Sequence, residues 1–269
     1  MKVSKMLFLM LVFGSFFSCE DVVDVELEEA EPRLVIEASL LWDIDDAESE
    51  QYVVLTTTAP FFDDEIPAAK GASVSVFDET GNEYLFEETE DGIFKNDKID
   101  PVLNSDYRLH INYQGEVYEA TEQFIPTPEI LYVEQENNGG FTGDDIELKI
   151  FYQDPGGMEN YYLFRFFEKN LSLQIYDDRF TDGSRNFAYY SAEDLESGDQ
   201  VGLEIQGISE GFYEYMYILR SQAGSSNGGP FQTQPTTVRG NIVNITNPEN
   251  FAFGYFRLSA TDFMSYTVE

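Results

Sequence analysis

The side chains suited to covalent chemistry are few in this sequence of 269 residues, which contains a single histidine, His110, and a single cysteine, Cys19. A serine or cysteine nucleophile of the triad kind needs a histidine as its general base. His110 occupies a polar position of an alternating segment, between Arg108 and Asn112, where a solvent-exposed strand residue is expected. One Cys and one His also fall short of a Cys/His zinc site. We therefore predict no catalytic residue of this kind.

Carboxylates are abundant instead, with 51 Asp and Glu residues. A glycosidase needs only two of them, held about 5 to 10 Å apart, and a sequence does not reveal that distance. Three acidic segments, residues 43–50, 63–65 and 177–178, offer oxygen ligands for calcium, but none has the spacing of an EF-hand loop. We expect a solvated acidic surface, no metal site, no cofactor and no enzyme activity. Calcium binding and glycoside hydrolysis stay open as alternatives.

The charge of the chain excludes one class of partner. Fifteen Lys and Arg residues stand against the 51 acids, so the formal net charge is −36. A surface of that charge repels nucleic-acid phosphates and anionic lipid headgroups. We expect no nucleic-acid partner, and any membrane attachment has to come from something other than basic side chains.

Residues 1–18 have the organisation of a secretory signal peptide. Two lysines precede an apolar run over residues 6–17, which is shorter than the roughly 20 residues of a membrane-spanning helix. The segment 16–19, Phe-Phe-Ser-Cys, resembles the lipobox of bacterial lipoproteins. The resemblance implies cleavage before Cys19 and a diacylglycerol on its thiol, which anchors the mature chain to the outer membrane. An ordinary signal peptide with an incidental cysteine is the alternative.

Residues 19–32 are rich in acids and contain no base, and we predict that they form a tether. Like charges repel one another, so such a segment stays extended. Its start, with Glu20, Asp21 and Asp24 after Cys19, is similar to the export signal of surface lipoproteins in Bacteroidota. This similarity implies display at the cell surface, with a lipoprotein facing the periplasm as the alternative.

From residue 33 onward the sequence alternates with a period of two, which is typical of half-buried strands. Residues 107–113 and 145–152 are clear cases, and turn signals such as Asp-Gly and Asn-containing segments separate the runs. An all-β protein is therefore predicted. Two segments, residues 161–167 and 212–219, are apolar at almost every position, so we expect them to be central strands that are covered on both faces. Strands whose outer face meets a partner are the alternative.

Two prolines at positions 126 and 128 suggest a domain boundary. We predict that residues 33–126 form an Ig-like or transthyretin-like β-sandwich. Residues 127–269 are expected to form a larger antiparallel β domain, with a polar loop over residues 221–234.

Exposed aromatic rings are the candidates for contact with a ligand or partner, because rings can stack on sugars while acids bind sugar hydroxyl groups. Trp42 and the pair Tyr189 and Tyr190 are the first candidates. Pro230 and Phe231 lie in the polar loop, where a partner could contact them. Core burial is the alternative for each ring, since a β-rich core also needs many aromatic residues.

An ordered set of short motifs resembles one family of Bacteroidota lipoproteins, known as domain of unknown function 4249. The motifs are residues 34–38 (LVIEA), 71–76 (GASVSV), 176–183 (YDDRFTDG), 198–201 (GDQV), 229–235 (GPFQTQP), 238–242 (VRGNI) and 253–256 (FGYF). The resemblance implies a lipid-anchored outer-membrane protein that is associated with TonB-dependent transporters, and it brings no catalytic residues. Family members continue into a C-terminal tail with a Cys pair, so we expect the last sheet to be shorter or closed differently here.

Together these observations predict a surface-exposed lipoprotein that acts as a non-catalytic accessory or substrate-capture partner of a TonB-dependent outer-membrane transporter. A glycan-binding surface adhesin is the alternative, and in either case a glycan or peptide is the expected ligand.

Overall fold

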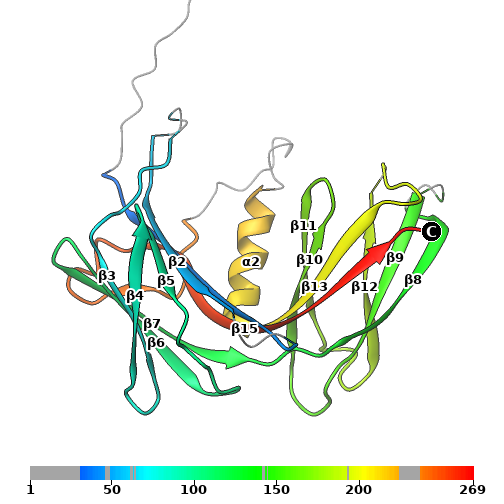
Figure 1. Ribbon diagram of the computed structural model, residues 1–269, viewed down its shortest axis with the longest axis horizontal. Helices are drawn as coiled ribbons and strands as arrows, with labels where there is room; N and C mark the ends of the chain where they lie inside the picture. The colour runs from blue at the N-terminus through cyan, green and yellow to red at the C-terminus, as the bar shows by residue number, and fades with distance from the viewer. Residues whose placement is uncertain are drawn as a thin grey trace, which may run out of the picture. The chain divides into compact units, whose positions relative to one another are not determined.

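The structure is a computed structural model that describes residues 31–45, 49–60, 63, 65–140, 143, 145–192, 194–223 and 237–269 (Figure 1). Within these residues the chain forms fifteen strands and the helix α2, which confirms the predicted all-β class. The elements are β1 (Leu34–Asp43), β2 (Gln51–Thr57), β3 (Ser73–Asp78), β4 (Glu83–Glu90), β5 (Ile93–Asn96), β6 (Asp106–Tyr113), β7 (Glu116–Ile125), β8 (Ile130–Gly139), β9 (Asp145–Gln153), β10 (Tyr161–Phe167), β11 (Leu171–Asp177), β12 (Arg185–Ser191), β13 (Gln200–Ile208), α2 (Glu210–Ala223), β14 (Val243–Asn244) and β15 (Phe253–Thr267).

The larger sheet is organised around the C-terminal strand β15, drawn in red in Figure 1. Its strand order is β11-β10-β13-β15-β1-β2-β5-β4-β3-β6-β7-β14. β15 is antiparallel to β13 and parallel to β1. β15 also pairs with β7, where Leu258 lies opposite Phe124. The strands from β1 to β7 are paired one after another in the order given, so the pairing of β7 with β15 closes them into a ring. A second sheet has the order β12-β9-β8.

The first buried core lies inside this ring of strands. β1 buries every second residue from Leu34 to Trp42, and β6 buries Tyr107, Leu109 and Ile111, which confirms the strand predicted over residues 107–113. β15 adds further apolar side chains to the same core. Removing this apolar surface from water is the main favourable contribution to folding.

β10 is covered on both faces, as its apolar sequence predicted. Tyr162, Phe164 and Phe166 pack against the sheet β12-β9-β8 in a second core. Tyr161 and Leu163 point to the opposite face, where α2 covers them in a third cluster. The sequence of β10 therefore reflects a central strand between two layers.

The other segment predicted as a strand, residues 212–219, is helical, and that prediction is wrong. The N–H of Phe212 is bonded to the Ser209 hydroxyl, as at a helix N-cap. Phe212 and Met216, four residues apart, face the sheet together, while Tyr217 is exposed. A short apolar run fits a buried strand and a buried helix equally well, so periodicity alone did not separate them.

The two halves of the chain have separate cores that share one strand. The first core is built mainly from residues before 126 and the second from residues after 129, and β15 contributes to both. The boundary near residue 126 stays a prediction. Residues 221–223 of the expected polar loop belong to α2, and residues 224–236 lie outside the described residues. Within the described part of the chain, no helix has the length and apolar character that crossing a membrane requires.

Candidate functional site

The structure describes three of the predicted contact residues and places them differently. Trp42 is only 5% exposed, and its ring meets Phe124 edge-on with centroids 5.1 Å apart. Tyr190 is equally buried and stacks on Phe166 in the second core. Tyr189 is 52% exposed. Of these three, Tyr189 alone offers its ring to a partner, while Trp42 and Tyr190 stabilise the fold.

The remaining predicted site residues lie outside the described residues. They are the lipidation site Cys19, the export-signal residues Glu20, Asp21 and Asp24, and the loop residues Pro230 and Phe231.

Tyr189 borders a row of aromatic side chains on the outer face of the sheet β12-β9-β8. Phe187 of β12 lies opposite Phe151 of β9, and Phe151 lies opposite Tyr132 of β8. The rings of Tyr132 and Phe151 stack with centroids 4.7 Å apart and an interplanar angle of 17°, and Phe187 follows at 5.3 Å from Phe151. Phe187 is 45% exposed. We call Tyr132, Phe151 and Phe187 the aromatic row.

Strand alternation explains why the row faces outward. In β9 the buried positions are Leu148, Ile150 and Tyr152, so Phe151 falls on the opposite face. The same parity in β12 buries Ala188 and Tyr190 and turns Phe187 and Tyr189 outward. Outward positions of a half-buried strand are usually polar. Aromatic residues at those positions were the sequence signal for this surface.

Charged side chains surround the row. Lys149 lies beside Phe187, with its ammonium 6.0 Å from the ring centroid, and forms ion pairs with Glu147 at 3.4 Å and Glu136 at 3.8 Å. Glu134 is opposite Lys149 on β8. Aromatic faces provide apolar contact area, and the carboxylates accept hydrogen bonds from hydroxyl or amine groups. This arrangement suits binding by contact.

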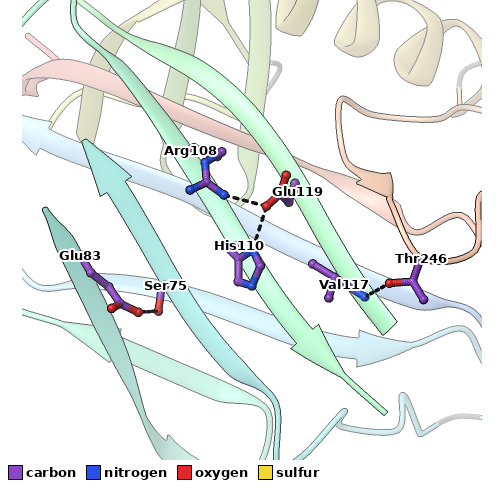
Figure 2. Close-up of polar contacts among 7 residues, drawn as sticks. All are labelled: Ser75, Glu83, Arg108, His110, Val117, Glu119 and Thr246. Carbon is purple, nitrogen blue, oxygen red and sulfur yellow. Dashed lines mark hydrogen bonds and ion pairs between the residues drawn. The ribbon is translucent and has the colours of Figure 1, made fainter. Parts of the chain in front are cut away.

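The single histidine is held in an ion-pair cluster on another sheet face (Figure 2). Its Nδ1 lies 2.8 Å from Glu119 Oε1, which also accepts a bond of 2.6 Å from Arg108. The hydrogen bond with His110, together with the Arg108 charge, holds the pKa of Glu119 below its usual range. Ser75 lies opposite His110 on β3, but its hydroxyl donates to Glu83 at 2.7 Å. In this structure, therefore, the serine proton is not directed at the histidine.

The candidates for holding a cation are three carboxylates at one end of the sheet that carries the aromatic row. Asp154 follows β9, and Asp178 and Asp182 lie between β11 and β12. Each contributes an oxygen to a group whose members lie within 4.8 Å of one another. Asp178 was among the acids considered for calcium from sequence, whereas Asp154 and Asp182 were not.

The fold is that of an all-β protein with an aromatic row on the outer face of its smaller sheet. The chain belongs to the family described as "Domain of unknown function (DUF4249)", whose model matches residues 20–263. This membership confirms the resemblance found in the sequence motifs. No curated protein matches the sequence.

Three solved structures share limited similarity with the chain. A DUF4785 family protein from Legionella pneumophila has 8% identity and a TM-score of 0.27, with 65% of this chain and 52% of that chain covered. A two-domain fibronectin type-III segment of chicken tenascin has 10% identity, coverage of 67% and 92%, and a TM-score of 0.21. The FN1–FN3 domains of chicken CNTN1 have 13% identity, coverage of 66% and 60%, and a TM-score of 0.22. The chain thus spans about half the length of the Legionella protein.

Proposed function

We propose that the protein is a surface-exposed lipoprotein that serves as a non-catalytic accessory or substrate-capture partner of a TonB-dependent outer-membrane transporter. The observation that carries the capture role is the aromatic row, because the exposed Phe187 ring, next to the half-buried rings of Phe151 and Tyr132 on one sheet face, provides a contact area for a ligand or partner. The charged residues around the row add polar contacts that orient what binds there.

The location is argued from the first residues of the sequence. The lipobox-like segment 16–19 supports acylation of Cys19, and the acidic segment 19–32 supports export to the cell surface. The full chain has a net charge of −36 and therefore little attraction for an anionic membrane surface, so the acyl chains have to provide the attachment.

The architecture proposed with this role has two parts. Residues 33–126 form an Ig-like or transthyretin-like sandwich, and residues 127–269 form the larger domain that presents the aromatic row. The separate first and second cores support this division, although β15 contributes side chains to both of them.

The transporter role is tested by copurification from gently solubilised membranes. Wild type is expected to bring down an outer-membrane transporter, and the double variant Phe187→Ala/Tyr189→Ala should recover at least about tenfold less, since the loss of two exposed contact rings removes well over 1.4 kcal/mol of binding. The matched control is Tyr52→Ala/Leu85→Ala, which removes two equally exposed side chains from strands of the other core. Wild type that is repeatedly recovered alone contradicts the accessory role.

The location is tested by protease treatment of intact cells, together with mass spectrometry of the membrane fraction. A surface lipoprotein is cleaved while a periplasmic marker survives, and its N-terminal peptide carries acyl chains on Cys19. The variant Cys19→Ala should leave the membrane fraction. A chain that is protected in intact cells contradicts surface display.

A glycan-binding adhesin is the second candidate, and the exposed rings of Phe187 and Tyr189 favour it, because an exposed aromatic ring can pack on the apolar face of a sugar while nearby carboxylates accept hydrogen bonds from its hydroxyl groups. The purified protein on a polysaccharide array separates the two functions. Binding that is lost in Phe187→Ala/Tyr189→Ala and kept in Tyr52→Ala/Leu85→Ala supports the adhesin. Absence of binding across the array counts against it.

A further inference from the structure

Three aspartates meet where the loops at one end of β9, β11 and β12 converge. Asp154 and Asp178 are each only 1% exposed, whereas Asp182 is exposed at the edge of the group. Backbone amides hold two of them in place: Gly183 N–H donates to Asp154 at 2.8 Å, and Gly157 N–H donates to Asp182 at 2.8 Å. The group is therefore a fixed arrangement with two buried carboxylates and an opening to solvent.

The buried carboxylate of Asp178 has no hydrogen-bond partner on either oxygen. Asn160, whose backbone carbonyl accepts a bond from the Asp178 N–H at 3.2 Å, also has a buried side-chain oxygen without a partner. An unpartnered buried polar oxygen costs about 1 to 3 kcal/mol, and more when it is charged. Asp178 and Asn160 are in contact and together have three such oxygens. These oxygens indicate that a ligand normally binds to them.

No positive side chain fills that role among the described residues. None of the three aspartates forms an ion pair, and the neighbouring Arg179 is bonded to Asp177 instead. Burial raises the pKa of Asp178, and the charges of Asp154 and Asp182 raise it further. The carboxylates thus repel one another, and the two buried ones do so where water screens them little.

We propose that Asp154, Asp178 and Asp182 bind one calcium ion, with the side-chain oxygen of Asn160 as a further ligand. Every donor is a hard oxygen and none is His or Cys, which favours calcium or magnesium over zinc or copper. Calcium is the better match because it accepts six to eight oxygens in irregular geometry, whereas magnesium demands a near-octahedral set and retains its waters.

The bound ion would join the loops that border the candidate functional site. β9 and β12 carry Phe151 and Phe187, and the loops that follow β9 and precede β12 contribute Asp154 and Asp182. These loops already touch where Gly156 and Gly183 approach each other, since a Cβ on Gly156 would stand 3.1 Å from Gly183 Cα. An ion at this point would fix the end of the sheet and, with it, the aromatic row.

The direct test is calcium binding by the full-length chain in detergent after treatment with EGTA and removal of the chelator. Isothermal titration calorimetry should show one saturable Ca²⁺ site per chain. At a hundredfold excess over Kd, the melting temperature should rise by about 5 to 10 °C. Magnesium chloride and sodium chloride at matched ionic strength should give a smaller rise, because they screen the net charge without filling the site.

The variant Asp178→Asn keeps the side-chain shape and removes the buried charge. It should melt no lower than wild type in EGTA, because a mutual repulsion is removed, and it should lose the calcium-dependent rise. The matched control Asp100→Asn removes an exposed acid elsewhere and should keep that rise in full.

A terbium titration gives an independent measurement. The Tyr162 hydroxyl lies 2.6 Å from Asp154, so Tb³⁺ at the site should luminesce when tyrosine is excited, and Ca²⁺ should displace it. The proposal is overturned if calcium shows no saturable binding, if magnesium and sodium raise the melting temperature as much as calcium does, or if Asp178→Asn binds calcium like wild type. Any of these results would show that the three aspartates do not form a calcium site with Asp178 as a ligand.

Discussion

Gly254 of β15 lies opposite Ile36 of β1 and so close to it that a Cβ on Gly254 would stand 1.9 Å from the Ile36 carbonyl oxygen. The φ angle of Gly254 is +96°, a conformation that residues with a side chain rarely adopt. This contact marks the point where the C-terminal strand enters its parallel pairing with β1. The closure of the strand ring therefore depends on the absence of a side chain at this position.

Replacement of Gly254 by alanine should lower the free energy of unfolding by about 3 kcal/mol or more, because the β15 backbone must move away from β1 and the positive φ is strained. Urea denaturation measures the loss. The control is Gly81→Ala, which has a φ of +88° but no atom within 4 Å of the added Cβ. Gly81→Ala introduces only the strain of the positive φ angle and should lower the free energy of unfolding by about 1 to 2 kcal/mol. Equal losses in the two variants would show that the Ile36 contact contributes nothing.

Arg257 of β15 provides a second test of the same region. It is 5% exposed and donates to Ser39 at 3.0 Å, Ser259 at 2.9 Å and Gln206 at 2.8 Å, and its guanidinium lies over the Phe212 ring of α2. The variant Arg257→Ala should lose about 3 to 5 kcal/mol of stability, because it leaves a cavity and three unpaired acceptors. Arg257→Met fills the space and removes the buried charge, so it should lose less. A methionine variant as unstable as the alanine variant would contradict this account of the network.

The sequence predicted local structure well and long-range pairing poorly. Alternation identified β6 and β9, because a half-buried strand carries its period of two in consecutive residues, and a continuous apolar run identified the two-sided burial of β10. It did not predict that β15 pairs with β1 across more than two hundred positions, since nothing in either segment specifies its neighbour. The helix α2 was missed because apolar residues also occupy its exposed face, at Tyr217, Ile218 and Leu219, so its sequence lacks a clear helical period.

For the candidate sites, too, the sequence indicates what is set within one strand but not which distant segments meet. Parity along β1 could have placed Trp42 inward, in phase with Leu34 and Leu40, and parity along β12 separates exposed Tyr189 from buried Tyr190. The meeting of Asp154 with Asp182 could not have been predicted, because the two residues lie in different loops and approach each other only when β9 and β12 pair.

The net charge of −36 predicts that the thermal stability of the protein depends on ionic strength. Self-repulsion among surface acids opposes the compact state, and salt screens it. The melting temperature should rise by about 2 to 5 °C between 10 and 150 mM NaCl. The measurement is made in EGTA, so that calcium plays no part, and a sucrose series serves as a control without ions. A melting temperature that does not change with NaCl would contradict the prediction.

The hydrogen bonds of Asp78, at the turn between β3 and β4, predict that the stability of the protein decreases at acid pH. Asp78 accepts hydrogen bonds from the side chain of Asn82 at 2.7 Å and from the Thr80 hydroxyl at 2.8 Å, which lower its pKa from 3.8 to about 2, with Asn82 the largest cause. Because the pKa is lower in the folded state, this contribution to stability is present above pH 3.8 and is lost as the pH falls through about 2. An NMR titration of the Asp78 carboxyl carbon should give a midpoint near 2. Asn82→Ala should raise the midpoint toward 3.8, and Thr80→Ala should raise it less. A wild-type midpoint near 4, or a larger effect of Thr80→Ala, would show that Asn82 does not hold the charge of Asp78.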